Sequence, residues 1–406
     1  MRIGLYISPA HAVPPDEKNI LAPWILIGQL ADGFVAKGHT VTLFAAKRSS
    51  TQAKLVHGGI EPTVSTRSAY ADADLYRSFV IAQELSLMRE VISHAKAKKL
   101  DIVHIHQPVE PLYPALLAMP SNVPVVITFH DPITPERFPA LEKLAALGNI
   151  HFVSLSKSQQ QRVPFRFAGM VPNGVDTKLF CPDELGNTGR KTRGVAGVGG
   201  PPPAGVPPVG GRGGKPLTGP VESFAVGKDH RPLLITGRIV PQKGFSDAIE
   251  AARATHERLL IVGQEYEEKQ EAKAYFEHDV QPFIDGKTVL WESVVKQEHL
   301  VGHYQTAKAL LFPIHWEEPF GLVMIEAMSC GTPVVAYNKG SVPEIVVDQK
   351  TGFIVDHSKG VAGLVAVIKR IGDIDRQACR NHVQKHFSLD TMIAGYERVY
   401  AKLCRP

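Results

Sequence analysis

A run of apolar residues late in the chain contains a single carboxylate at its centre. The stretch from His315 to Tyr337 reads HWEEPFGLVMIEAMSCGTPVVAY, and Glu326 stands within its apolar part, LVMIEAM. A helix that is apolar on nearly every side is normally buried, and a buried carboxylate is costly unless it is protonated, paired or hydrogen-bonded. We therefore expect a polar partner for Glu326.

The same stretch predicts a helix that begins near Phe320 to Leu322 and ends before Gly331. Pro319 suits a first helical turn, and Gly331 suits a helix terminus. Glu318 then lies just ahead of the helix. The free backbone N–H groups at that end favour an anion, whereas the Glu326 carboxylate accepts hydrogen bonds from hydroxyl groups.

Two cations occupy a loop in the segment LLITGRIVPQKGFSDAIEAA. A strand is expected to end at Gly237, the loop contains Arg238 and Lys243, and Gly244 precedes an amphipathic helix. Cations beyond the carboxyl end of a strand are well placed for a phosphate. Combined with the two glutamates, this pattern predicts a ligand with a diphosphate between two polyols, which is a nucleotide sugar.

The elements that must position these residues follow an α/β pattern. Short runs rich in Val and Ile alternate with helix-length segments, which is typical of a parallel sheet covered by helices. The predicted strands are 3–7, 40–44, 102–105, 125–129 and 151–155 in the first half, and 233–236, 258–262, 288–291, 309–312 and 333–336 in the second half. The two series predict two doubly wound, Rossmann-like domains.

Composition describes an ordinary globular protein of 406 residues. Hydrophobic residues make up 44% and charged residues 21%, and a chain of this length exceeds one comfortable core. The net charge of +5 suits an anionic ligand but is no signature of nucleic-acid binding. The four cysteines form no CxxC pair, and we see neither a signal peptide nor a membrane-spanning stretch, so we expect a cytoplasmic protein.

One segment departs from this pattern. The run GVAGVGGPPPAGVPPVGGRGGKPLTGP is dominated by Gly and Pro and offers too little apolar side chain for a core. We predict an N-terminal domain over residues 1–175, a disordered insertion over 185–222, a nucleotide-sugar-binding domain over 223–388 and a C-terminal helix over 389–406.

The spacing of Glu318 and Glu326 resembles the E-x7-E motif of a known enzyme family. EEPFGLVMIEAMSCGTPVVA downstream of GR-x4-KG is similar to the retaining GT-B glycosyltransferases of family 4, the glycosyl transferases group 1 type. Further matches are LADGFVAKGHTVTLFAA, VPNGVD, LLIVG and GSVPEIVVDQKTGFIV. The resemblance implies the GT-B fold, in which two Rossmann-like domains face a cleft and the final helix, about 389–403, returns to the first domain.

The resemblance also implies roles in the donor site. Glu318 would bind hydroxyls of the donor sugar, Glu326 the ribose hydroxyls, and Arg238 and Lys243 the diphosphate. An ion pair with a basic core residue is the structural alternative for Glu326, and Glu317 is a rival to Glu318 that the spacing disfavours. The other implied donor-site residues are Gly237, Val262, Gly263, Phe320, Gly321 and Leu322.

A histidine completes the implied site from the first domain. His130 follows the strand in VVITFHDP, where open α/β sheets bind ligands, and the family has a histidine there against the donor sugar. A histidine satisfied within the core is the alternative. His104 and His106 alternate on a strand, but two ligands do not complete a metal site, so we expect them to line the cleft or to be packed. The resemblance also implies no metal and no other cofactor, because in this fold the cationic pair would stabilise the leaving diphosphate.

One loop differs from the family. The family often has a Gly-Gly pair after its first strand, whereas this chain reads HAVPPDEKNILAPW, where Lys18 and Asn19 are alternative donors. The expected partners are a nucleotide-sugar donor and a hydroxyl acceptor that is a sugar, a lipid-linked compound or a small molecule. The run QQQRVPFRF is a candidate for contact with the inner face of a membrane, although an exposed loop is the simpler interpretation.

The predicted function is hexosyl transfer with retention, from a donor of the UDP-glucose type or, second, GDP-mannose. The alternative within the fold is a sugar-nucleotide epimerase or hydrolase, which releases the sugar without an acceptor. A nicotinamide oxidoreductase predicts GxGxxG after the first strand, and MRIGLYISPAHAVPPDEK lacks it. A non-catalytic carbohydrate-binding module has no need of the cationic pair and both glutamates.

Overall fold

The structure is a computed structural model of the chain. It describes residues 1–15, 21–106, 110–183, 231–266, 269–293 and 297–404. The predicted insertion over 185–222 and the loop residues Lys18 and Asn19 lie outside these ranges.

The first sheet has seven parallel strands in the order β3-β2-β1-β4-β5-β6-β7. These strands are β1 (Arg2–Tyr6), β2 (Thr40–Phe44), β3 (Lys54–Val56), β4 (Ile102–Ile105), β5 (Val125–Thr128), β6 (Ile150–Ser154) and β7 (Gly169–Met170). The helices of this domain are α1 (Ala22–Ala36), α2 (Ala73–Lys96), α3 (Tyr113–Leu117), α4 (Phe138–Ala145) and α5 (Lys157–Gln160). The order reverses at β1, which is the doubly wound arrangement.

The second sheet has six parallel strands in the order β10-β9-β8-β11-β12-β13. These strands are β8 (Leu233–Thr236), β9 (Leu259–Val262), β10 (Val289–Glu292), β11 (Ala309–Phe312), β12 (Val334–Tyr337) and β13 (Gly352–Val355). The helices that follow are α6 (Phe245–Ala254), α7 (Gln270–Tyr275), α8 (Gln297–Thr306), α9 (Leu322–Ser329), α10 (Val342–Ile345), α11 (Gly360–Ile368), α12 (Arg376–His386) and α13 (Leu389–Leu403). The prediction of two doubly wound parallel sheets is confirmed.

All ten predicted strands are present, with ends that differ from the prediction by at most one residue. The prediction omitted three strands. These are β3 and β7, the outer strands of the first sheet, and β13, an outer strand of the second. An outer strand pairs on one side only, and β3 and β7 are three and two residues long. Such short runs have too little apolar periodicity to be recognised as strands.

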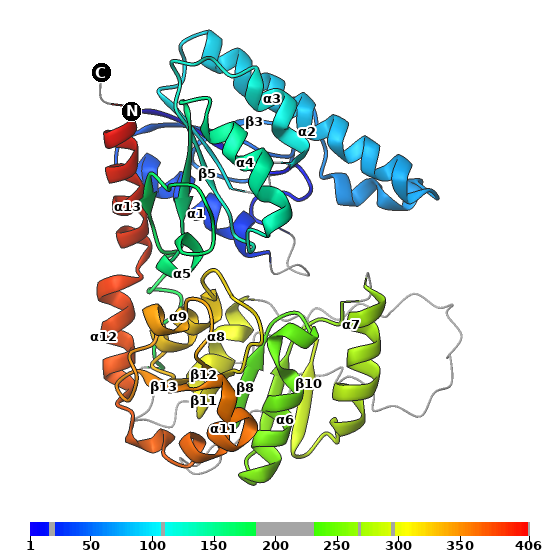
Figure 1. The fold of residues 1–406 in the computed structure, drawn as a ribbon, viewed down its shortest axis with the longest axis vertical. Coiled ribbons are helices and arrows are strands. Elements are labelled where there is room, and N and C mark those ends of the chain that lie inside the picture. Colours follow the sequence, from blue (N-terminus) through cyan, green and yellow to red (C-terminus); the bar gives the residue numbers. More distant parts are fainter. Residues whose placement is uncertain (16–20, 107–109, 184–230, 267–268, 294–296, 405–406) are drawn as a thin grey trace, which may run out of the picture.

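Alternation along the central strands gives the first sheet two apolar faces. On β4, Val103 and Ile105 face a core shared with α2, α3 and α4, whereas Ile102 faces a core shared with α1 and α13. The helix α13 begins after Ser388, whose hydroxyl accepts a hydrogen bond from the backbone N–H of Thr391. Figure 1 shows α13 alongside the first domain and α12 beside the second. The last helix therefore returns to the first sheet, as predicted.

Candidate functional site

An ion pair links the two loops that the sequence singled out. Nζ of Lys243 lies 2.5 Å from Oε2 of Glu318, and the indole N–H of Trp316 donates to the same oxygen at 2.9 Å. The Lys243 and Glu318 side chains are 17% and 12% exposed, so the pair is largely shielded from water. The ammonium also lies 5.1 Å from the centre of the Trp316 ring. The spacing argument thus selected the glutamate that contacts Lys243.

A glycine in the left-handed conformation holds Lys243 in place. The loop closes as a 3-10 turn over Pro241–Lys243, and Gly244 follows with a φ of 70° before α6 begins at Phe245. A Cβ atom on Gly244 would lie 1.9 Å from the carbonyl oxygen of Pro313. Only glycine allows this close approach, so the backbone fixes the loop against the segment that leads to Glu318.

The N-terminus of α9 lies immediately after Glu318. Gly321 is its N-cap with a φ of 83°, and in the described chain no side chain caps the first turn. Phe320 is buried, and its carbonyl accepts a hydrogen bond of 2.6 Å from the Ser341 hydroxyl. The backbone N–H groups of an uncapped first turn favour a bound anion.

Glu326 has a polar partner within the protein. The hydroxyl of Tyr304, on α8, donates to Oε2 of Glu326 at 2.8 Å. Burial raises the pKa of the Glu326 carboxyl to about 7, and the hydrogen bond from Tyr304 opposes that rise. The answer to the initial question is a tyrosine hydroxyl, and the predicted ribose contact remains a prediction.

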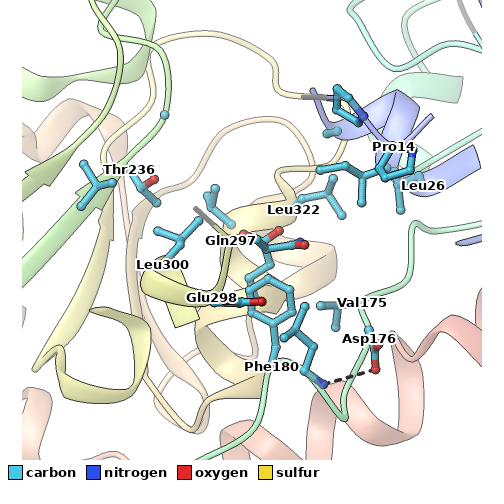
Figure 2. Close-up of a pocket in the computed structure, with 18 of the residues that line it drawn as sticks. Pro14, Leu26, Val175, Asp176, Phe180, Thr236, Gln297, Glu298, Leu300 and Leu322 are labelled. Atoms are coloured by element: carbon cyan, nitrogen blue, oxygen red, sulfur yellow. Dashed lines mark hydrogen bonds between the residues drawn. The ribbon is translucent and has the colours of Figure 1, made fainter. Parts of the chain in front are cut away.

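A cavity of about 530 Å³ lies between the domains beside Glu326. Figure 2 shows Leu322 with Thr236 on one side and Pro14 and Leu26 on the other. Of the predicted donor-site residues, Gly237, Arg238, Val262, Gly263, Leu322 and Glu326 line the cavity. The guanidinium of Arg238 lies 5.5 Å from the ring centre of Tyr266.

Five predicted residues lie outside the lining of this cavity. They are Lys243, Glu318, Phe320, Gly321 and His130. The first two belong to the ion pair, and the next two enter α9 from the same loop. The predicted second-domain residues therefore form two groups. Lys243, Glu318, Phe320 and Gly321 lie around the N-terminus of α9, and the remaining residues line the cavity.

His130 lies beyond the end of β5, as predicted, and contacts another histidine. Its Nε2 is 3.1 Å from Nδ1 of His106, and burial lowers the pKa of the His130 imidazole to about 4. His104 and His106 are fully packed, being 0% and 2% exposed. Within the described ranges, no group of three or more His, Cys, Asp or Glu side chains is arranged to hold a metal ion.

Sequence reasoning missed several residues around the cavity. Tyr304, Gln297 and Glu298 come from α8, Val175 lies within the VPNGVD motif, and Phe180 follows that motif. A tyrosine four residues after Leu300 looks like an ordinary core position on an amphipathic helix. The Tyr304 hydroxyl reaches Glu326 only because α8 packs against α9, and no local sequence pattern predicts that packing.

Contacts also cross between the domains next to this site. The Glu344 carboxylate accepts hydrogen bonds from the backbone N–H groups of Lys157 at 2.7 Å and Ser158 at 2.8 Å, which begin α5. Arg162 forms an ion pair of 3.0 Å with Glu317. In the QQQRVPFRF run, Phe165 and Phe167 pack against the core between the first sheet and helices α2, α3 and α4, so the aromatic rings of the run point inward. No helix in the described chain has both the length and the apolar character to cross a bilayer.

Comparisons with known proteins identify the family to which the two domains are similar. The family described as Glycosyl transferases group 1 matches residues 222–385, and Glycosyltransferase Family 4 matches residues 25–179. A GDP-mannose-dependent phosphatidylinositol monomannoside mannosyltransferase of Mycolicibacterium smegmatis is 30% identical over 179 residues, 40% of this chain and 45% of the relative. The matched stretches span about half the length of the first curated relatives.

Solved structures show the same fold over nearly the whole chain. Sucrose-phosphate synthase from Thermosynechococcus elongatus superposes with a TM-score of 0.67 at 19% identity, covering 99% of this chain and 98% of that structure. An Anabaena protein in complex with UDP and glucose gives a TM-score of 0.62 at 15% identity, covering 99% and 100%. At these identities the likeness concerns the fold alone, and it is the GT-B fold. Together with the two family matches, it places this chain in family 4 of the GT-B glycosyltransferases.

Proposed function

We propose that the protein transfers a hexose from a nucleotide diphosphate sugar to a hydroxyl acceptor with retention of configuration. The observation that supports this most is the Lys243–Glu318 pair at the uncapped N-terminus of α9, next to a cavity lined by Arg238 and Glu326. The cations and the free backbone N–H groups suit a diphosphate, and the two carboxylates suit the hydroxyl groups on either side of it.

In this proposal each charge exchanges its present partner for the donor. Lys243 and Arg238 bind the diphosphate, so Glu318 is released to accept hydrogen bonds from hydroxyls of the sugar. Glu326, which already accepts from Tyr304, has a second carboxylate oxygen for the ribose. His130 approaches the sugar from the first domain. Charge-assisted hydrogen bonds of this kind contribute about 1.5–3 kcal/mol each.

The chemical step exchanges one bond for another at the anomeric carbon. The bond from that carbon to the phosphate oxygen breaks, and the acceptor oxygen bonds to the same face. The acceptor proton goes to the departing phosphate oxygen, so no protein nucleophile is required. The negative charge that grows on the diphosphate is stabilised by the two cations and the α9 terminus, and we expect the reaction to be independent of added metal.

For the donor we favour the UDP-glucose type, with GDP-mannose second. An Anabaena protein of the same fold is in complex with UDP and glucose, and the mycobacterial relative is named for GDP-mannose, so relatives support both choices. The acceptor is a sugar, a lipid-linked hydroxyl compound or a small molecule. We place the reaction in the cytoplasm, either free or at the inner face of the membrane.

A two-step experiment tests the proposed function. Thermal shifts with UDP, GDP, ADP and dTDP identify the base, because a ligand that binds only the native state raises the Tm. The matching nucleotide sugar is then incubated with and without hydroxyl acceptors, and NMR reports the anomeric configuration of the product. Release of sugar at the same rate without acceptor identifies a hydrolase instead. Conversion into an isomeric nucleotide sugar identifies an epimerase.

A further inference from the structure

Three imidazole rings form a continuous hydrogen-bonded row inside the first domain. Nε2 of His130 lies 3.1 Å from Nδ1 of His106, and Nε2 of His106 lies 3.2 Å from Nδ1 of His104. The His106 and His130 rings stack with an interplanar angle of 24°. Only His130 has a part in the proposed function, so the other two rings call for an explanation.

The inner end of the row reaches the last helix of the chain. Nδ1 of His104 lies 2.5 Å from the hydroxyl of Tyr400, on α13, and its Nε2 lies 2.9 Å from the hydroxyl of Thr128, on β5. The Thr128 hydroxyl is in turn 3.2 Å from that of Tyr396. His104, Thr128 and both tyrosines are 0% exposed, so these contacts exclude water.

Burial keeps the groups in the row neutral. It lowers the pKa of His104 and of His106 well below the usual range, and lowers that of His130 to about 4. It raises the pKa of the Tyr400 hydroxyl well above its usual value. Near neutral pH each ring therefore has one N–H and one bare nitrogen, and the Tyr400 hydroxyl retains its proton.

Tyr400 determines where each of these protons lies. A buried hydroxyl proton needs an acceptor, and in the described chain Nδ1 of His104 is the polar atom within reach of Tyr400. His104 must then have its proton on Nε2, from which it donates to Thr128. The single lone pair of that Nδ1 accepts mainly from Tyr400, but two bare nitrogens 3.2 Å apart would repel each other, so Nε2 of His106 carries its proton and shares the same acceptor. Nδ1 of His106 is bare as a result, and it accepts from Nε2–H of His130.

We propose that His106 is a positioning residue for His130: it accepts a hydrogen bond from Nε2–H of His130 and leaves Nδ1 of His130 as an acceptor for a hydroxyl of the donor sugar. This inference rests on the proposed function for its ligand. With the protons reversed along the row, Nδ1 of His130 would be a donor, and the Tyr400 hydroxyl would lose its acceptor. The row thus links the hydrogen-bonding character of the site to a tyrosine on α13.

Variants at His106 separate positioning from packing. Asparagine at 106 places its amide oxygen near the former Nδ1, so His106→Asn retains an acceptor, whereas His106→Leu fills similar space without one. We expect His106→Leu to lower kcat about tenfold to a hundredfold with a smaller change in KM, and His106→Asn to remain within about threefold of the parent. Equal kcat losses in two folded variants would overturn the proposal. His151→Leu, a half-buried histidine of β6 outside the row, is the matched control.

A spectroscopic measurement tests the row without catalysis. In ¹⁵N-histidine-labelled protein, with His130 assigned by comparison with His130→Asn, we expect the ¹⁵N shifts of a ring protonated at Nε2. Tyr400→Phe should convert them to those of a mixed tautomer population. Protonation of His130 at Nδ1 in the parent, or unchanged shifts in Tyr400→Phe, would overturn the inference. A parent with the expected shifts that transfers no sugar would instead overturn the proposed function.

Discussion

On the second-domain side of the cleft, Lys243 and Glu318 meet as opposite charges, whereas on the first-domain side His130 and His106 meet as two neutral rings. The charged pair is largely shielded, with 17% and 12% of its side chains exposed, and in the proposed function it exchanges partners when a charged ligand arrives. The neutral row ends in fully buried hydroxyls and offers no such exchange. Under the proposed function, the second domain supplies binding energy for a charged donor, while the first supplies a fixed hydrogen-bonding direction.

Two buried groups near the cleft, Glu326 and His130, have pKa values shifted in opposite directions. Glu326 has a pKa raised to about 7, so its contribution to stability is present below about pH 4.5 and is lost as pH rises through 7. His130 has a pKa lowered to about 4, so its contribution is present above pH 6.5 and is lost as pH falls through 4. Both groups favour their uncharged forms in the ligand-free protein.

The largest expected effect is on the charged side. Lys243→Met retains most of the side-chain stem and removes the charge that, in the proposed function, stabilises the departing diphosphate. We expect kcat at saturating donor to fall about a hundredfold or more, since a preorganised charge at a developing anion is worth a few kcal/mol. Steady-state kinetics measure this, with Lys308→Met as the control because Lys308 pairs with Glu257 in the same domain. A raised KM with unchanged kcat would reduce Lys243 to uniform binding.

Glu326→Gln should act in opposite senses on ligand binding and on stability. Donor affinity is expected to fall about tenfold to a hundredfold, the equivalent of one charge-assisted hydrogen bond. Above pH 7 the ligand-free variant should be more stable than the parent, by up to about 3 kcal/mol, because glutamine never ionises. Calorimetric titration and urea unfolding at pH 5 and pH 8 measure the two effects. Glu257→Gln is the control, and equal stability of parent and variant at both pH values would contradict the assignment.

The neutral side predicts loss of stability in acid. Between pH 6.5 and pH 4 the free energy of unfolding should decline by up to about 3 kcal/mol from His130 alone, because the unfolded state takes up a proton that the native state resists. His130→Asn should show a shallower decline, measured by urea unfolding across this range. The exposed His278, replaced by Asn, should leave the slope of the parent unchanged.

The smallest effect concerns one of the contacts that join the two domains. Glu344→Ala removes the carboxylate that caps α5 from the other domain, and loss of a cap typically costs about 1 kcal/mol. We expect Tm to fall by about 2 °C, with kcat within threefold of the parent. Differential scanning calorimetry tests this against the exposed Glu142→Ala. An unchanged Tm would show that the domains hold their arrangement without this carboxylate.

The sequence predicted the central strands of both sheets but missed three outer strands. It also singled out the charged residues of the candidate site, but not the hydrogen bonds among the histidines. Central strands such as β5 and β11 are short, mainly apolar runs, VVIT and ALLF, which the local pattern identifies. Arg238, Lys243, Glu318 and Glu326 lie in two short stretches, so their spacing alone suggested a shared ligand. The contact between Lys243 and Glu318 follows from two loops at the same edge of one sheet.

The histidine row could not be predicted in the same way. Alternation on β4 indicated that His104 and His106 share a face, but their partners come from β5 and α13. His104 and Tyr400 are 296 residues apart, and their contact depends on the path by which α13 returns to the first sheet. Tyr304 and Glu326 present the same difficulty over 22 residues, because two helices must pack before the hydroxyl meets the carboxylate.

The return of α13 to the first sheet also imposes an order on biosynthesis. His104 leaves the ribosome 296 residues before Tyr400, which at about 5–20 residues per second is a delay of roughly 15–60 s. During that interval the nascent first domain lacks the helix that covers Leu30, Phe34 and Val171. The part of the enzyme that is made first is therefore the part completed last, and chaperones that bind exposed apolar surface have their longest opportunity there.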